Sequence, residues 1–208
     1  MTMNRREFLI GLVAVSAYPL AARADSVDDT LAKIAKARAG AKSLVGPFTQ
    51  TATVGLLRSQ VQSSGKLYLQ YPDRLRWELG PPDSVTYWVA PEGLAYRGAH
   101  GSGRVPIDTT QQADVEALRA MLGGNLNVLR SRFDVREVPS DTGGPAFECT
   151  PKASGQPVKL RKLTFALDPD LVRPRKATIV YDSRNQTQIV FGELRRDVPI
   201  DPSLLRLP

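Results

Sequence analysis

The side chains that most often carry enzyme chemistry are scarce in this sequence of 208 residues. It contains one histidine, His100, and one cysteine, Cys149. A serine triad needs a histidine base, and the Gly-x-Ser-x-Gly turn that presents such a serine is absent. A zinc site needs several Cys or His ligands, and a lone cysteine among strand residues is typical of a buried, inert thiol. We therefore expect no enzyme, no cofactor and no metal.

Two further patterns could carry chemistry. Neighbouring carboxylates, such as Asp28 and Asp29 or Glu92 with a distant partner, are the groups that acid–base catalysis uses. The acidic residues fall mostly in predicted turns, helix caps and outward strand positions, where solvation explains them. Ser63-Ser64-Gly65-Lys66 superficially resembles a phosphate loop, but the earlier glycine is missing and Leu67 replaces the required Ser or Thr. Neither pattern predicts an active site.

A strand pair between Ser64 and Leu79 is the clearest structural signal in the chain. Its apolar residues alternate with polar ones, which indicates two half-buried antiparallel strands. Pro72 lies at the corner between them, because proline fixes φ and donates no ladder hydrogen bond. The residues predicted to share the buried face are Leu67, Leu69, Tyr71, Leu75, Trp77 and Leu79. Another element must cover this face.

The remaining segments predict an α+β, mainly β, fold. Pro91-Glu92-Gly93 joins two further strands as a hairpin, and a strand interrupted near Gly55 precedes the central pair. Turns recur about every ten residues in the second half of the chain, which is typical of an antiparallel sheet. The later strands are predicted at Phe133 to Val138, Ala146 to Thr150, Lys162 to Leu167, Lys176 to Tyr181 and Thr187 to Leu194. We expect ten or eleven strands and two or three helices.

Two segments predict helices. Over residues 25–44, Val27, Leu31, Ile34 and Ala35 form one apolar stripe, with Lys33, Lys36 and Arg38 outside it. Residues 108–122 form the second, whose stripe is Val115, Leu118, Met121 and Leu122. The glycine-rich segment His100 to Arg104 is predicted to be a loop. The first helix could plug the mouth of a barrel or form a lid over a ligand, and the sequence leaves both interpretations open.

The first 24 residues predict a signal peptide. Arg5 and Arg6 precede an apolar run of 15 residues, and Ala22-Arg23-Ala24 is typical of a cleavage site. Asn4 to Leu9 also resembles a twin-arginine export signal, although the general secretory route stays open. Residues 25–208 then form a single domain, whose length suits one hydrophobic core.

The charge of the chain is moderately basic. The signal contains three arginines and one glutamate, so its removal lowers the formal net charge from +7 to +5. This excess favours anionic surfaces, such as lipid headgroups or acidic protein patches. Outside the cytoplasm nucleic acid is not an expected partner. Basic residues cluster late in the chain, between Lys152 and Arg196, where a solvated sheet face and a docking surface are both possible interpretations.

The central strand pair also carries a resemblance to a known family. Gly65-Lys66-Leu67-Tyr68-Leu69, then Pro72 and Trp77-Glu78, resemble the strand pair of the LolA family, the periplasmic carriers of bacterial lipoproteins. Further segments follow in the family's order over nearly the whole mature chain. They are Phe48-Thr49-Gln50, Val85-Thr86-Tyr87-Trp88-Val89, Glu92-Gly93-Leu94-Ala95-Tyr96 and Cys149-Thr150-Pro151-Lys152-Ala153-Ser154.

The resemblance implies an incomplete antiparallel β-barrel wrapped around a helical lid, with a cavity for acyl chains. The cavity residues expected on this basis are Leu67, Leu69, Tyr71, Leu75, Trp77, Val85, Tyr87, Val89 and Leu94. The expected lid residues are Leu31, Ile34, Leu118, Met121 and Leu122. The implied partners are acylated lipoprotein cargo, an inner-membrane ABC-type lipoprotein-releasing transporter and an outer-membrane receptor. We expect a periplasmic monomer.

The sequence departs from the family in two places. Tyr71 stands where the best-known members have an arginine that fastens the lid, and Arg74 or Arg76 could replace it or be solvent-facing strand charges. The chain also ends soon after Leu205, so we expect it to lack the extra C-terminal strand of some members. Two alternatives therefore stay open: a carrier of another amphiphile, such as a glycolipid, and a sensor domain of the same fold that binds an envelope protein.

Overall fold

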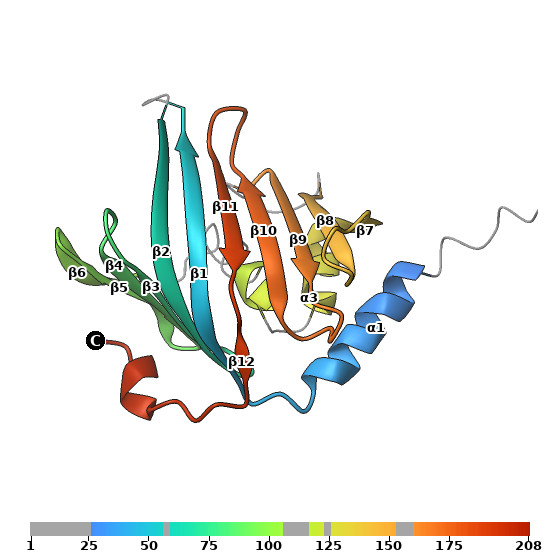
Figure 1. Ribbon diagram of the computed structural model, residues 1–208, viewed down its shortest axis with the longest axis horizontal. Coiled ribbons are helices and arrows are strands. Elements are labelled where there is room, and N and C mark those ends of the chain that lie inside the picture. The colour runs from blue at the N-terminus through green and yellow to red at the C-terminus, as the bar shows by residue number, and fades with distance from the viewer. Residues whose placement is uncertain (1–25, 56–58, 106–116, 123–125, 153–159) are drawn as a thin grey trace, which may run out of the picture.

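The computed structural model describes residues 26–55, 59–105, 117–122, 126–152 and 160–208. Its main element is one antiparallel sheet, which is strongly curved (Figure 1). The strands are β1 (Ser43–Val54), β2 (Ser59–Gln70), β3 (Arg74–Leu79), β4 (Val85–Ala90), β5 (Gly93–Gly98), β6 (Gly101–Val105), β7 (Phe133–Val138), β8 (Ala146–Pro151), β9 (Lys162–Leu167), β10 (Pro174–Val180), β11 (Gln186–Phe191) and β12 (Arg195–Arg196).

The sheet is open. Its strand order is β6-β5-β4-β3-β2-β1-β11-β10-β9-β8-β7, with β12 paired to β1 off this path. β6 and β7 are therefore edge strands, and the described residues form an incomplete barrel of mainly β structure, as the sequence predicted. The helices are α1 (Ser26–Arg38), α3 (Asn127–Arg132), a helical segment at residues 117–122 and the 3-10 helix η1 (Pro202–Leu205). Both α1 and α3 contact β7.

The long strands β1 and β2 join the two halves of the sheet. They pair over their full length, from Ser43 with Gln70 to Val54 with Ser59. The ring of Phe48 lies over Gly65, where an added Cβ would come within 2.3 Å of the ring. Phe48 also packs against Trp77 with ring centroids 3.9 Å apart. Only glycine leaves room for this contact, which anchors the core at the centre of the sheet.

The first helix is shorter than the sequence predicted. It ends at Arg38, whereas residues up to 44 were predicted helical. Gly46-Pro47, a pair that is typical of a helix end, lies inside β1. Leu44 is fully buried in the core, and its pairing with β2 and β12 outweighs helix propensity. Pro47 is tolerated because β1 changes its neighbour here from β12 to β11, so no ladder N–H is needed.

The glycine-rich segment from His100 to Arg104 was predicted to be a loop. The structure instead places most of it in the edge strand β6. It pairs with β5 from Gly98–Gly101 to Leu94–Val105. An added Cβ on Gly103 would lie 2.9 Å from the ring of Tyr96. The glycines therefore let an aromatic side chain of β5 lie over the edge strand. The helix predicted at residues 108–122 is observed at residues 117–122, and the preceding part lies outside the described residues.

Candidate functional site

The curled sheet encloses an apolar hollow between its two halves. The hollow measures about 280 Å³, and we call it the inner hollow. One wall comes from β3, β4 and β5, the other from β10 and β11, and the helical segment 117–122 contributes one side chain. Its lining residues are Gln50, Leu75, Trp77, Leu79, Tyr87, Val89, Leu94, Leu118, Ile179, Tyr181, Thr187 and Ile189.

A second hollow of about 500 Å³ adjoins the first, and we call it the mouth hollow. The two share three residues, Gln50, Leu79 and Tyr87. The mouth hollow is more polar, since Asp83 and His100 line it. Together the hollows form a continuous surface that changes from apolar inside to polar outside. An amphiphile presents the same change along its length.

The helical segment 117–122 is held in place by two arginines. Arg38, at the end of α1, donates to the carbonyl oxygens of Ala120 at 2.7 Å and Met121 at 2.9 Å. Arg119 donates to the carbonyl oxygen of Asp73, in the turn between β2 and β3, at 2.8 Å. These contacts tie the segment that bears Leu118 both to α1 and to the sheet.

Arg38 is the most deeply buried charge at the site, and only 5% of its surface is exposed. Burial lowers its pKa to about 10, although Tyr71 and Asp170 nearby oppose this shift. Burial likewise raises the pKa of Tyr71 to about 12, against the effect of Arg38. Carbonyl oxygens of the helical segment accept from both terminal nitrogens of the guanidinium, and a buried charge without such partners would be strongly destabilising.

The structure offers little for catalysis or metal binding. Within the part of the chain that it describes, no three His, Cys, Asp or Glu side chains converge as a metal site requires. Cys149 is buried, and burial raises the pKa of its thiol to about 12. None of the helices in the described ranges has the length and apolar character needed to cross a bilayer.

Comparison with known proteins decides the family. The model of the family described as outer membrane lipoprotein carrier protein LolA matches residues 39–207. The chain belongs to the LolA family. An outer-membrane lipoprotein carrier protein from Dechloromonas aromatica (strain RCB) is 27% identical over 205 residues, which cover 95% of this chain and 90% of that protein. LolA-family carriers are binding proteins without catalytic activity.

Several solved structures resemble this chain at low sequence identity. A DUF1329 family protein from Desulfovibrio piger is 13% identical, with a TM-score of 0.51 and coverage of 86% of this chain and 97% of that one. A LolA superfamily protein from Nitrosomonas europaea is 9% identical, with a TM-score of 0.45 and coverage of 86% and 96%. The MucA/MucB complex of Pseudomonas aeruginosa contains a chain 18% identical, with a TM-score of 0.47 and coverage of 85% and 59%.

The nine residues predicted to line a cavity fall into three groups. Leu75, Trp77, Tyr87, Val89 and Leu94 line the inner hollow, and Tyr87 also lines the mouth. Val85 lines the mouth hollow alone. Leu67 and Leu69 are core residues with at most 2% of their surface exposed, and Tyr71 packs partly buried against the same core. Strand alternation identified the inward face, but it could not tell packed positions from hollow ones.

The predicted lid residues all belong to the main core cluster. Leu31 and Ile34 of α1, with Met121 and Leu122, are buried, and Leu118 packs against them partly exposed. Only Leu118 lines the inner hollow. In this LolA-family fold the other four side chains therefore hold the helices to the sheet rather than border the hollow.

Sequence reasoning missed the wall formed by β10 and β11. Ile179, Tyr181, Thr187 and Ile189 lie there. They alternate along their strands in the same way as the residues of β3 and β4. This alternation indicates an inward face on β10 and β11. That this face lies opposite β3 and β4 follows only from the pairing of β1 with β11, which joins the two halves of the sheet.

Among the described residues, Arg74 and Arg76 contact groups other than the helices predicted to form the lid. Arg74 forms an exposed ion pair with Glu92 at 2.9 Å. Arg76 pairs with Glu78 on the outer face, lies 5.0 Å from the ring of Trp88 and donates to the carbonyl oxygen of Leu204 at 3.2 Å. The exposed ion pair of Arg74 favours its solvent-facing interpretation. Arg38, which was predicted to lie outside the apolar stripe, contacts the helical segment 117–122.

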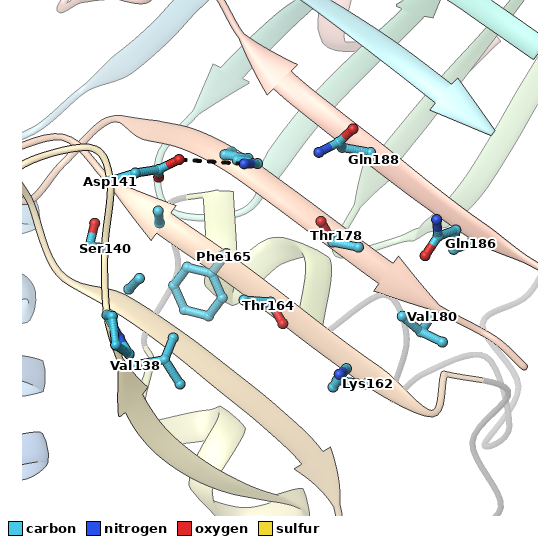
Figure 2. Close-up of a pocket in the computed structure, with 14 residues that line it drawn as sticks. Val138, Ser140, Asp141, Lys162, Thr164, Phe165, Thr178, Val180, Gln186 and Gln188 are labelled. Carbon is cyan, nitrogen blue, oxygen red and sulfur yellow. Dashed lines mark ion pairs between the residues drawn. The ribbon is translucent and has the colours of Figure 1, made fainter. Parts of the chain in front are cut away.

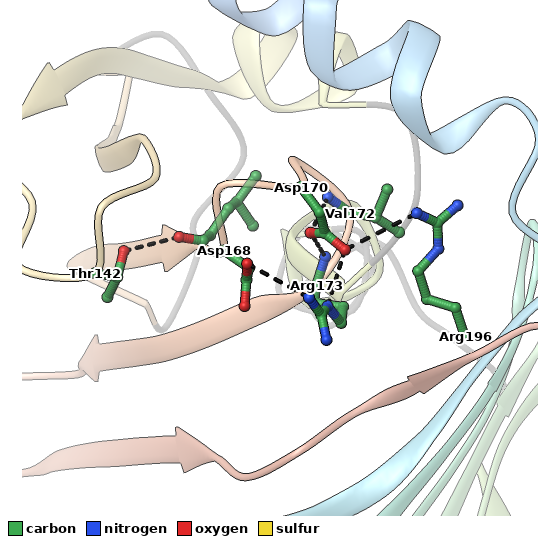
Figure 3. Close-up of polar contacts among 7 residues, drawn as sticks. Thr142, Asp168, Asp170, Val172, Arg173 and Arg196 are labelled. Atoms are coloured by element: carbon green, nitrogen blue, oxygen red, sulfur yellow. Dashed lines mark hydrogen bonds and ion pairs between the residues drawn. The ribbon is translucent and has the colours of Figure 1, made fainter.

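In the turn between β9 and β10, several hydrogen-bond donors surround the carboxylate of Asp170 (Figure 3). Asp170 accepts hydrogen bonds from the backbone N–H groups of Val172 at 2.9 Å and Arg173 at 3.0 Å. Its second oxygen accepts from Nε of Arg173 at 2.8 Å and lies 3.9 Å from Arg196. Burial raises the pKa of Asp170, but these donors outweigh it and hold the pKa below its usual value.

A larger hollow of about 650 Å³ lies on the outer face of the sheet (Figure 2). Thr164, Thr178 and Gln188 line it, at positions that alternate with the inward residues of β9 to β11. An ion pair between Asp141 and Lys176 spans 3.6 Å at one end. It mixes apolar residues with charged and polar ones and lies on the outer face of the sheet, whereas the lining of the inner hollow is mostly apolar.

Proposed function

We propose that this protein is a periplasmic carrier that binds the acyl chains of lipoproteins and moves them from the inner to the outer membrane. The inner hollow supports this proposal most directly. Its walls are mostly aliphatic and aromatic, it opens onto a more polar mouth, and a helical segment borders it. Family membership supports the same function, and residues 1–24 are proposed to direct export.

The hydrophobic effect explains why such cargo needs a carrier. Each buried methylene contributes about 0.8 kcal/mol, so one sixteen-carbon chain contributes roughly 12 kcal/mol to membrane anchoring. Cargo with several such chains does not cross water unaided at a useful rate. The carrier must supply an apolar site and still bind less tightly than the receptor that takes the cargo. A small, partly open hollow bordered by a separate helical segment meets both needs if that segment can be displaced.

The proposed cycle has two partners. An inner-membrane ABC-type lipoprotein-releasing transporter delivers the acylated chain to the hollow, and an outer-membrane receptor accepts it. No chemical step is needed, because binding and release move the cargo without breaking a bond. Displacement of the helical segment 117–122 would widen the inner hollow for entry, since Leu118 is its contribution to the lining.

Native mass spectrometry tests the proposal. Mature protein purified from periplasm without detergent is offered a triacylated lipoprotein, and the mass of the complex is measured. The variant Leu94→Glu places a carboxylate in the inner hollow and should abolish the complex. Thr86→Glu makes the same charge change on the outer side of the neighbouring strand and should bind normally.

An apo mass that persists after lipoprotein is offered would contradict the carrier function. A stable complex with an envelope protein, without bound lipid, would then favour a sensor role. Bound glycolipid in place of lipoprotein would keep the acyl site and change the cargo.

A further inference from the structure

The mouth hollow has a polar composition that acyl chains alone do not need. Two tyrosines, Tyr87 on β4 and Tyr96 on β5, are direct cross-strand partners there, and each is 38% exposed. Large aromatic side chains exposed side by side are uncommon on a surface with no ligand. Their rings offer apolar faces, and their hydroxyls offer hydrogen bonds.

Gln50 lies where the two hollows meet. It lines both, and the structure gives its side-chain amide no hydrogen-bond partner among the described residues. A primary amide donates two hydrogen bonds and accepts two. Its position therefore places both kinds of hydrogen-bonding group at the point where an acyl chain in the inner hollow would join its polar head.

Asp83 gives the mouth its charge. Ser63, which is only 2% exposed, donates from its hydroxyl to Oδ2 of Asp83, so a buried group fixes the carboxylate. Asp83 lies close enough to Tyr87 to help burial raise the pKa of that phenol. Among the described lining residues there is no lysine or arginine to balance the carboxylate. His100 is the one basic side chain among the described lining residues, so a phosphate placed in this hollow would lie near the Asp83 carboxylate without a lysine or arginine there to offset the repulsion.

We infer that the mouth hollow binds the polar head of the cargo and selects an uncharged head, rich in hydroxyl or amide groups, over an anionic phosphate head. This inference rests on the proposed function, because the acyl chains must occupy the inner hollow. The shared chemistry fits two sources, the glyceryl–cysteinyl peptide of a lipoprotein and the sugar of a glycolipid. Gln50 supplies hydrogen bonds, the tyrosine rings stack, and Asp83 excludes phosphate.

Three probes with the same short diacylglyceryl chains test the inference. One carries a phosphoglycerol head, one a glucose head, and one an N-acylated, C-terminally amidated cysteinyl peptide. Dissociation constants are measured below the critical micelle concentration by displacement of a fluorescent acyl reporter. Because the chains are identical, differences in affinity report the mouth hollow alone. At least one uncharged probe should bind about tenfold more tightly than the phosphoglycerol probe, as expected for one like-charge contact.

Matched variants assign this selectivity. Asp83→Asn should raise the affinity for the phosphoglycerol probe about tenfold, in line with loss of one exposed charge contact. The affinities for the uncharged probes should change by less than about threefold. Gln50→Leu should weaken the preferred uncharged probe about fivefold, the size of a typical net hydrogen bond. Gln188→Leu, on the outer face of β11, should change neither the affinity for the phosphoglycerol probe nor the affinity for the uncharged probes. The uncharged probe that binds more tightly identifies the source.

The inference would be overturned, and the acyl site kept, by either of two results. One is equal affinity for all three heads, and the other is a preference for uncharged heads that Asp83→Asn leaves unchanged. Failure of every probe to displace the reporter would remove the proposed function and this inference together. Circular dichroism of the Asp83→Asn protein checks that the turn after β3 has kept its fold.

Discussion

The guanidinium of Arg38 donates a hydrogen bond of 2.9 Å to the main-chain carbonyl oxygen of Met121. The two residues are 83 positions apart in the chain, and this contact joins the end of α1 to the helical segment beside the inner hollow. A second bond to Ala120 makes the attachment bidentate. The family's lid-fastening arginine is absent at Tyr71, and a charge from the first helix now contacts the segment that lines the hollow.

Replacing Arg38 should loosen this segment. Arg38→Met keeps the length and apolar stem of the side chain but removes both hydrogen bonds, and each bond to a charged group contributes about 1.5–3 kcal/mol. Hydrogen exchange of the amides in residues 117–122 should accelerate at least tenfold. Mass spectrometry of deuterium uptake measures it, with Lys36→Met, an exposed change on the same helix, as the control. Unchanged exchange would show that packing alone holds the segment.

The hydroxyl of Tyr71 is buried beside Arg38 and has no hydrogen-bond partner within the described chain. A buried polar group without a partner costs about 1–3 kcal/mol. Tyr71→Phe removes the hydroxyl and keeps the ring, so the free energy of unfolding should rise by about 1 kcal/mol. Urea denaturation measures the change, and Tyr68→Phe on the outer face is the control. A loss of stability greater than the control's would mean that the hydroxyl has a partner in solution.

The sheet could be predicted from the sequence because its signals are local. Alternation in Leu75 to Leu79 and the proline at residue 72 depend only on neighbours along the chain. The role of Arg38 could not be predicted in this way. A helical stripe is recognised by its apolar members, and an arginine joins the buried face only when distant carbonyl oxygens satisfy its charge. The position of the inner hollow depends similarly on β11 pairing with β1, a contact distant in sequence.

The same limit explains the errors at the ends of elements. Gly46-Pro47 predicts a helix end by local rules, yet the residues lie in β1 because sheet pairing continues past them. Gly101 and Gly103 predict a loop, yet both lie in an edge strand, and Gly103 lies under the ring of Tyr96. In both cases a tertiary contact decides between two conformations that glycine permits equally.

Cys149 should react with thiol reagents only when the protein unfolds. Burial, with a smaller effect of Glu148, raises its pKa from 9.0 to about 12. At pH 8 the thiolate fraction is then on the order of a thousandfold lower than in the unfolded chain. Iodoacetamide labelling, followed by mass, should be slow in buffer and rapid in guanidinium chloride. Labelling at the unfolded rate in buffer would place the thiol at the surface.

The same thiol gives stability a pH dependence. The folded protein holds the thiol proton more tightly than the unfolded chain. The contribution of this thiol to the free energy of unfolding is therefore complete below pH 9.0 and is lost as the pH rises toward about 12. Cys149→Ala should remove this part of the alkaline loss. Unfolding free energies of both proteins between pH 8 and 10.5 test the sign, and a parallel decline in the two would contradict it.

Asp170 should stabilise the turn between β9 and β10 at neutral pH and lose this role in acid. Its pKa is held below the usual 3.8, so its contribution is present above that pH and is lost as the pH falls through the folded value. Asp170→Asn should cost about 1 kcal/mol at pH 7, given its partial exposure, and progressively less at lower pH. Asp134→Asn, an exposed change on β7, is the control. A deficit independent of pH would assign the effect to turn geometry.

The two tryptophans of the chain lie on opposite faces of the sheet and can report separately on the acyl site. Trp77 lines the inner hollow, whereas the indole N–H of Trp88 donates to the carbonyl oxygen of Leu204 at 2.9 Å on the outer face. Trp88→Phe leaves Trp77 as the only tryptophan, and Trp77→Phe leaves Trp88. A brominated acyl chain quenches indole fluorescence only at contact distance. It should therefore quench the first variant strongly and the second hardly at all. Equal quenching would mean that the chain binds outside the inner hollow, and quenching of Trp88 alone would move the site to the outer face under the C-terminal residues.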